Sequence, residues 1–183
     1  MNLGKLLLRL VVGGLFVGHG LQKLRGSFGG PGLDGATQMM GALNMHPPRR
    51  NAVAAAVTET AGGAAIALGV ATPFAAAGLI ATMLTAVRKV HLANGLWNSG
   101  GGYEYNAVLM AAVTALADDG PGTISFDALI GKSRWGLGWG LFAIVAGVVG
   151  STGAIELGRR SAPAVSTDDA DQGATPESTD AAI

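Results

Sequence analysis

The stretch that decides the fold is Asn51 to Leu92, NAVAAAVTETAGGAAIALGVATPFAAAGLIATMLTAVRKVHL, which is apolar at most positions. Ala71-Thr72-Pro73 near its middle is too short for anything but a tight turn. The segments Asn51 to Val70 and Phe74 to Leu92 therefore form an antiparallel pair of helices. Each approaches the ~20 apolar residues needed to cross a bilayer, so the stretch predicts a membrane-spanning hairpin.

The composition of the 183-residue chain also indicates a membrane protein. Charged residues make up only 13% of the chain, about half of the ~25% found in soluble domains. The 30 glycines suit transmembrane helices that pack closely, because lipid gives helices no hydrophobic reason to associate. The net charge of zero, without a basic stripe, argues against a nucleic-acid partner. The absence of cysteine excludes disulfides, thiolate nucleophiles and iron–sulfur clusters built by this chain alone.

Three further apolar segments complete the predicted spans. Leu3 to Leu21 predicts the first helix, with a cleaved signal peptide as the alternative. Asn106 to Ala117 predicts a short fourth helix, and Trp135 to Ile155, which contains no charged residue, predicts a fifth. We therefore expect an all-α integral membrane protein: an antiparallel four-helix transmembrane bundle with a fifth, C-terminal transmembrane helix.

The predicted domain organisation has three parts. Residues 1–131 form the four-helix membrane domain, and residues 132–160 carry the additional transmembrane helix. Residues 161–183 contain acidic but no basic residues and are rich in Ala, Ser, Thr and Pro. Such a segment cannot bury a core, so we expect a disordered acidic tail.

Three local features of the sequence predict helix ends and helix contacts. Asp34 is expected to cap a short helix near Thr37 to Leu43, and Ser125 to cap a brief amphipathic turn on the membrane surface. Gly14 and Gly18 form a GxxxG pair, which predicts a packing face on the first helix.

The unusual polar residues are expected to meet at one end of the bundle. We name the side of the membrane that holds Met1 side A and the opposite side side B. In an antiparallel bundle the first and third helices end at side B, and the second and fourth begin there. Polar residues of all four helices fall at these ends and form the candidate site: His19, Lys23, Glu59, Lys89, His91, Tyr103 and Glu104.

Glu59 is the most informative of these residues, because it lies about 12 Å inside its span at 1.5 Å per residue. A charged residue at the centre of a span costs roughly 2.5–3.5 kcal/mol by insertion scales unless it is paired or reached by water. The candidate partners are Lys23, Arg88, Lys89 and a histidine. A carboxyl group that only joins neighbouring helices is the structural alternative to a proton or ligand site.

Histidines and carboxylates at one depth raise the question of a metal. His19 and His91, together with Glu59 and Glu104, are residue types that bind transition metals, and two histidines on separate helices can ligate haem. However, no HxxxH or ExxH spacing lies on one helix. We therefore predict no metal site and no haem.

Several motifs, in this order and spacing, resemble the DoxX family of small four-helix membrane proteins. They are HGLQKL from His19, FGGPG from Phe28, ETAGGAAIALGVATP from Glu59, KVHLANG from Lys89, GGYEYN from Gly101 and DGPGTISFDALIG from Asp119. The resemblance spans about Leu3 to Gly131, so the fifth apolar segment and the tail are additions to the family pattern. It implies a multi-pass protein of the bacterial cytoplasmic membrane.

The resemblance also implies a function, because some relatives are named as membrane subunits of quinone-reducing oxidoreductases. The leading hypothesis is a redox-associated subunit whose polar pocket holds a quinone-like ring or exchanges protons. Its cofactor would be a quinone, and its partners would be an oxidoreductase, membrane lipids and further subunits in a homo- or hetero-oligomer. Whether the chain is itself an enzyme stays open. The alternatives are a non-enzymatic scaffold or assembly factor, and a small lipid or metabolite transporter.

The basic residues predict the orientation in the membrane. Side A carries Lys5, Arg9, Lys132 and Arg134, whereas side B carries Lys23, Arg25, Arg49, Arg50, Arg88, Lys89, Arg159 and Arg160. The positive-inside rule then places side B in the cytoplasm. A single cysteine at Ser27, in this cysteine-free chain, should react with an impermeant thiol reagent only after the cells are lysed. Labelling in intact cells would contradict this orientation.

Overall fold

The computed structural model describes residues 3–163, and the regular elements in that range are helices. The longer helices are α1 (Leu3–Arg25), α2 (Gly32–Ala42), α3 (Pro48–Leu68), α4 (Thr72–Ala86), α5 (Glu104–Asp119), α6 (Phe126–Leu129) and α7 (Leu137–Arg160). A π-helical turn, η2 (Val87–His91), and the 3-10 turns η1 (Ser27–Gly29), η3 (Leu92–Asn94) and η4 (Asn98–Gly100) complete the set. The predicted all-α fold is confirmed. The predicted acidic tail lies outside the described residues from residue 164 onward.

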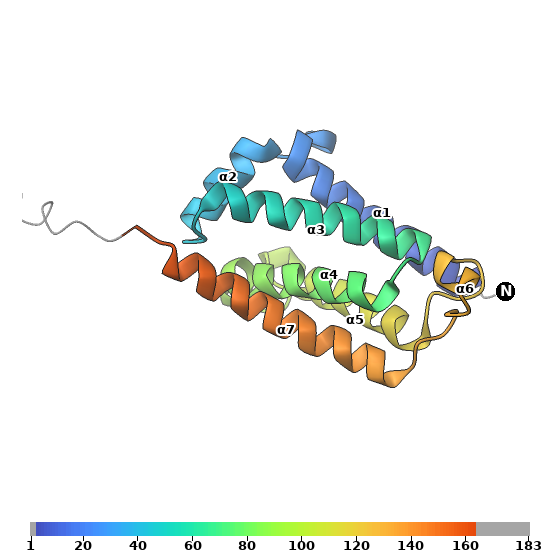
Figure 1. Ribbon diagram of the computed structural model, residues 1–183. Helices are drawn as coiled ribbons and strands as arrows, with labels where there is room; N and C mark the ends of the chain where they lie inside the picture. The colour runs from blue at the N-terminus through green and yellow to red at the C-terminus, as the bar shows by residue number, and fades with distance from the viewer. Residues whose placement is uncertain (1–2, 164–183) are drawn as a thin grey trace, which may run out of the picture.

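The long helices lie in two layers (Figure 1). α1, α2 and α3 form one layer, and α4, α5 and α7 form the other, with the most extensive contacts between α1 and α3 and between α4 and α7. α7 begins near α6 and the N-terminal end of α1, and it ends beside α2. Side A is therefore the end that holds α6, side B is the end that holds α2, and the described chain starts and finishes at opposite ends.

The helices are those of a membrane protein. Four segments are long and apolar enough to cross a membrane: Leu3–Arg25, Pro48–Leu68, Thr72–Asn94 and Leu137–Arg160. α5 has 16 residues, or about 24 Å at 1.5 Å per residue, against a hydrocarbon thickness of about 30 Å. This agrees with the short fourth helix that the sequence predicts. Leucine and valine side chains remain exposed along α1 and α7, as expected where the surrounding solvent is lipid.

Glycines bring α1 and α3 into close contact. A Cβ atom added to Gly13 would lie 2.5 Å from the carbonyl oxygen of Gly63, and one added to Gly63 would lie 2.7 Å from that of Gly13. A Cβ atom on Gly20 would also collide with α3. Gly14 and Gly18 instead have nothing within 4 Å of an added Cβ, so within residues 3–163 no other helix packs on them, and their packing role stays a prediction. The GxxxG spacing shows that two glycines share a face of the helix, and not that this face is buried.

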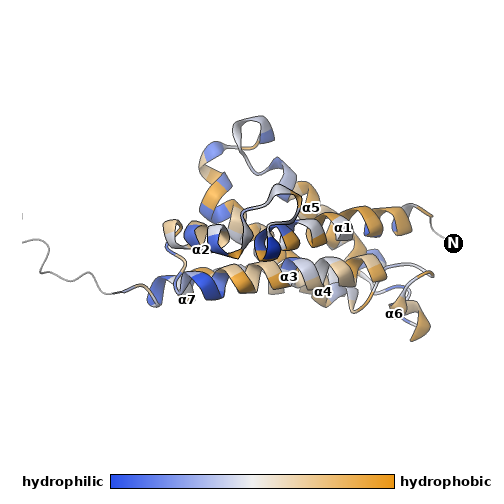
Figure 2. Cartoon of the chain, turned by 90° about the horizontal axis from the view of Figure 1, so that it is seen from above, coloured by the Kyte–Doolittle hydropathy of each residue, from blue (hydrophilic) through white to orange (hydrophobic). Residues whose placement is uncertain are grey.

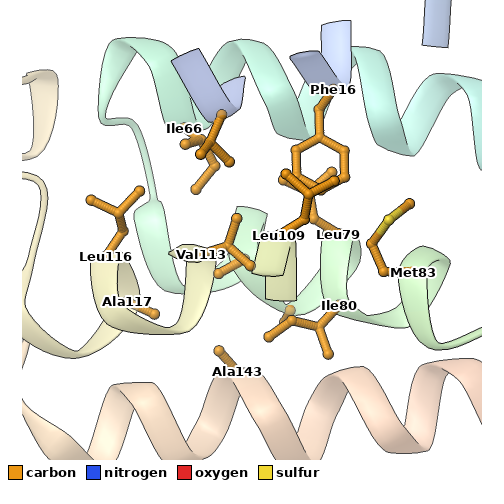
Figure 3. Close-up of a cluster of buried hydrophobic side chains, with 13 residues drawn as sticks. Phe16, Ile66, Leu79, Ile80, Met83, Leu109, Val113, Leu116, Ala117 and Ala143 are labelled. Carbon is orange, nitrogen blue, oxygen red and sulfur yellow. The ribbon is translucent and has the colours of Figure 1, made fainter. Parts of the chain in front are cut away.

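The apolar core lies between the two layers, and α7 takes part in it (Figure 3). The labelled side chains come from five helices: Phe16, Ile66, Leu79, Ile80, Met83, Leu109, Val113, Leu116, Ala117 and Ala143. Ala143 belongs to α7, where a Cβ atom on Gly147 would collide with Ile80 of α4. The Oγ atoms of Thr85 and Ser151 lie 3.0 Å apart in a hydrogen bond between the same two helices. The added C-terminal helix is therefore packed against the others.

Arg9 of α1 is buried, with 2% of its surface exposed, and it caps the C-terminal end of α3. Its Nε donates to the carbonyl oxygen of Ile66 at 3.1 Å, and an Nη donates to that of Ala67 at 2.7 Å. The last carbonyl groups of a helix lack partners within it, and a cation there also interacts favourably with the helix dipole. The other Nη donates to Pro121 at 2.8 Å and to Ile124 at 2.6 Å. One guanidinium thus joins α1, α3 and the loop after α5.

Asp127 of α6 caps the N-terminal end of α4, and it is 3% exposed. One carboxylate oxygen accepts from the backbone N–H of Ala71 at 2.7 Å. The other accepts from the N–H of Thr72 at 3.0 Å, from its hydroxyl at 2.7 Å and from the indole N–H of Trp135 at 3.2 Å. A carboxylate that accepts N–H groups at a helix start satisfies donors that have no partner within the helix. Side A of the bundle is therefore held by two buried charged groups.

Helix boundaries differ from expectation in two places and agree in a third. The turn between α3 and α4 lies at residues 69–71, and Pro73 falls in the first turn of α4, where its missing N–H costs nothing. Asp34 lies inside the first turn of α2 and does not cap it, so that prediction is wrong. Ser125 caps α6 as predicted, because its Oγ accepts the N–H of Ala128 at 3.2 Å.

Replacing Arg9 should destabilise the bundle. Arg9→Gln leaves several buried carbonyl groups without a donor, which should lower the free energy of unfolding by about 3 kcal/mol. Arg9→Lys should fall between this variant and the wild type. Arg49→Gln removes a charge that is 68% exposed and should change stability by less than about 0.5 kcal/mol. Thermal melts in detergent measure all three, and an Arg9→Gln variant that melts like the wild type would contradict the capping role.

Candidate functional site

A cavity of about 620 Å³ lies in the half of the bundle nearer side B, and we name it the central cavity. Its lining comes from α1, α2, α3, α4, η2, α5 and α7. Most of its wall is apolar, with many alanines and four methionines, Met39, Met40, Met45 and Met83. Figure 2 shows hydrophilic residues gathering toward the end of the molecule that holds α2, whereas the outer end of α1 is hydrophobic. The cavity therefore combines a mostly apolar wall with a few polar and charged side chains, among them Lys23, Glu59 and Lys89.

The central polar feature of the wall is an ion pair between α1 and α3. The Nζ of Lys23 lies 2.6 Å from an Oε of Glu59, and the Glu59 side chain is only 5% exposed. Lys23 also contacts the carbonyl oxygen of His19 at 3.4 Å. Of the four partners that the sequence offered for Glu59, the structure selects Lys23. The close approach of α1 and α3 places both charged groups in one polar contact, which offsets the cost of burying the carboxylate.

His19 joins this pair to α5. Its Nδ1 lies 3.1 Å from the amide oxygen of Gln22, which accepts, so we assign the proton to Nδ1. Its Nε2 then accepts from the hydroxyl of Tyr105 at 3.5 Å, and the two rings meet edge to face at 6.0 Å. Tyr105 lines the cavity. The imidazole and the phenol form a second polar contact beside the ion pair.

The π-helical turn η2 delivers Lys89 and His91 to the cavity. In an α-helix, successive residues are about 100° apart around the axis, so three in a row do not normally face one side. Here Lys89, Val90 and His91 all line the cavity. The His91 Nδ1 donates to the carbonyl oxygen of Gly101 at 2.7 Å, which holds this turn against the loop that leads to α5. Such π-helical turns are rare and are frequently found at functional sites.

Two of the predicted site residues do not line the cavity. An Oε of Glu104 accepts the backbone N–H of Asn98 at 2.9 Å, and so it closes the loop before α5. Tyr103 immediately precedes α5, and its N–H donates to the carbonyl oxygen of Gly95 at 3.1 Å. The structure thus brings His19, Lys23, Glu59, Lys89 and His91 together and leaves Tyr103 and Glu104 outside the cavity, at the start of α5. Whether any of the seven serves a ligand stays a prediction.

The methionines and Asn106 were missing from the predicted site. Met39 and Met40 come from α2, which the sequence predicted as a short helix near Thr37 to Leu43 without assigning it to the site. Asn106 is 6% exposed, and its side-chain amide donates to the sulfur of Met83 at 3.4 Å. The sequence feature that could have identified them is their position near the side B ends of helices. Met side chains at such positions are flexible enough to shape an irregular cavity.

Within residues 3–163, no group of three or more His, Cys, Asp and Glu side chains is placed to hold a metal ion. The Glu59 carboxylate instead contacts an ammonium group. The wall therefore offers ion pairing, proton exchange, and hydrogen bonds to a polar group on a largely apolar guest.

A double-mutant cycle should measure the ion pair. Lys23→Met leaves the Glu59 carboxylate buried and unpaired, and it should lower the free energy of unfolding by about 3 kcal/mol. Adding Glu59→Leu should restore most of this loss, because an apolar pair of similar volume suits the interface between α1 and α3. Thermal or denaturant unfolding in detergent provides the four stabilities. Additive effects of the two substitutions would show that the pair is not a structural unit.

Comparison with known proteins agrees with the resemblance seen in the sequence. The DoxX family model matches residues 4–92, which run from α1 through η2 and include the five predicted residues that line the central cavity. No curated protein and no solved structure matches the chain. Residues 4–92, which are just under half of the chain, are thus similar to the DoxX family.

Proposed function

We propose that this chain is a redox-associated membrane protein whose central cavity binds a quinone-like, lipid-soluble molecule and exchanges protons with it. The observation that supports this most is the position of a buried carboxylate and a histidine on the wall of an otherwise apolar cavity. Apolar pockets with a few convergent polar groups are the usual form of small-molecule sites.

The size and wall of the cavity suit such a guest. A volume of about 620 Å³ falls within the ~300–1,000 Å³ of known ligand pockets. Met39 and Met40 supply adaptable, polarisable contacts for a flat ring or an isoprenoid chain. The Tyr105 ring, which meets the His19 ring edge to face, lies on the same wall. A guest whose apolar chain lies among the methionines would place its polar ring near the ion pair.

The polar groups suit proton exchange. A quinone takes up two protons when two electrons reduce it, so its site needs groups that can give protons to ring oxygens. Tyr105 and His19 are hydrogen-bonded to one another, and the Glu59 carboxylate accepts a hydrogen bond from the ammonium of Lys23. Carboxylates and imidazoles are the side chains that exchange protons most readily near neutral pH. We propose that the electrons come from a partner oxidoreductase, and that the chain acts as its membrane subunit.

A non-enzymatic scaffold is the second candidate, and the ion pair itself favours it. Lys23 and Glu59 contact one another at 2.6 Å across α1 and α3, as groups that only hold two helices together would do. On this reading the cavity is a by-product of the diverging layers, and the chain recruits partner proteins. Under either function, we propose that the protein resides in the bacterial cytoplasmic membrane with side B in the cytoplasm.

Binding of a soluble quinone separates the two candidates. The wild-type protein in nanodiscs should bind decylubiquinone saturably, and Glu59→Gln and His19→Ala should weaken binding at least tenfold, because each removes a polar group at the site of the ring. Glu156→Gln is the matched control, since Glu156 pairs with Arg159 and Arg160 near the end of α7 and does not line the cavity. Isothermal titration calorimetry gives the affinities. No binding to the wild type, or equal binding to Glu59→Gln, would favour the scaffold.

A further inference from the structure

We infer that the molecule bound in the central cavity is an amphiphile with an anionic head group, and that Lys89 is the residue that recognises the anion. The inference rests on the proposed function in one respect, namely that the cavity holds a ligand. It adds the charge of that ligand, which neither the fold nor the family determines.

The charges on the wall do not balance. Three residues with formal charge line the cavity: Lys23, Glu59 and Lys89. Lys23 and Glu59 neutralise one another at 2.6 Å. One positive charge is left over. The two histidines of the wall, His19 and His91, can only add to it, and the uncharged phenol of Tyr105 does not offset it. An apolar cavity with an excess of one cation favours a guest that supplies one anion.

Lys89 is the cation without a partner. Within residues 3–163, no hydrogen bond or ion pair engages its ammonium group, and its side chain is partly buried. The neighbouring Arg88 differs, because its guanidinium donates to Thr152 of α7 at 3.1 Å. A lysine at the end of a membrane helix normally extends its ammonium toward water. Lys89 lines the cavity, and its side chain is partly buried there.

The backbone explains how Lys89 comes to line the cavity. Lys89 continues the face of α4 that lines the cavity at helical spacing, through Ala81, Thr82, Thr85 and Ala86, and the π-helical turn η2 adds Val90 and His91 to it. The bond from His91 to Gly101 fixes this turn from the loop side. A π-helical turn gives up regular α-helical hydrogen bonds, and such turns are kept most often where they present side chains to a site. Here the charged residue presented is Lys89.

The shape of the cavity completes the ligand class. The methionines and alanines of α2, α3 and α4 can accept an aliphatic chain or ring system, and Lys89 lies with His91 at the polar end. An ammonium binds a carboxylate, a phosphate or an ionised hydroxyl of a quinone ring by the same charge-assisted hydrogen bond. The anion can therefore belong to an acidic quinone or to an acidic lipid. The structure assigns the feature that both share, an anionic head group on an apolar body.

A matched pair of quinones tests the charge. A 2-hydroxy-3-alkyl-1,4-naphthoquinone is an anion at neutral pH, and its 2-methoxy analogue is neutral with nearly the same shape. The wild-type protein in nanodiscs should bind the hydroxy compound at least tenfold more tightly, by titration calorimetry. Lys89→Gln should lose most of this preference and still bind the methoxy compound, whereas Lys89→Arg should keep the preference. Arg50 is exposed near the start of α3, at side B, so Arg50→Gln should leave this preference unchanged.

Laurate and dodecanol form a second matched pair, which separates an acidic lipid from an acidic quinone. Preferential binding of laurate that requires Lys89, without binding of either quinone, would support the anion site while the quinone function fails. Equal binding of both quinones, with no effect of Lys89→Gln, would overturn the anion site while leaving the quinone function intact. Retained binding of the methoxy compound shows that Lys89→Gln is folded. Failure of all four compounds to bind the wild type would overturn both proposals.

Discussion

The structure depends on one constraint: a charged group inside an apolar bundle must find a partner within the protein. Arg9, Glu59 and Asp127 are each at most 4% exposed, and each meets several polar atoms or an opposite charge. In lipid an unmet charge or backbone group costs several kcal/mol, so these contacts select one arrangement of helices from many that pack equally well. Two of the three groups lie at side A and tie α1, α3, α4 and the loop after α5 together.

The central cavity follows from where these contacts lie. At side A, Arg9 and Asp127 hold the two layers at the turn between α3 and α4. At side B the layers meet at the edge, where the N–H of His46 donates to the carbonyl oxygen of Gly158 at the end of α7. Between these points α3 and α4 have far less contact than α1 has with α3. The space left has a mostly apolar wall that also carries polar residues, among them Lys89, whose charge pairs with no other group of residues 3–163.

The sequence was sufficient for the helices and for the end at which polar residues gather, because apolar length and antiparallel order determine both. It was not sufficient for the contacts. Arg9 looked like a charge near the membrane surface, and its partners Pro121 and Ile124 lie more than a hundred residues away. Gly14 and Gly18 looked like the packing pair because of their GxxxG spacing. Spacing shows that two glycines share a face of the helix, but it does not show which face is buried. The π-helical turn left no mark in the pattern, so Lys89 could be placed at side B but not on the wall of a cavity.

The central claim is that the cavity at side B holds a ligand whose anionic head contacts Lys89. A high-resolution structure of the protein purified with its native lipids tests this most directly. The account predicts elongated density among Met39, Met40 and Met83, with a polar head within hydrogen-bond distance of the Lys89 ammonium. A cavity filled by inward movement of α2 and α7, with Lys89 extended into solvent, would contradict it.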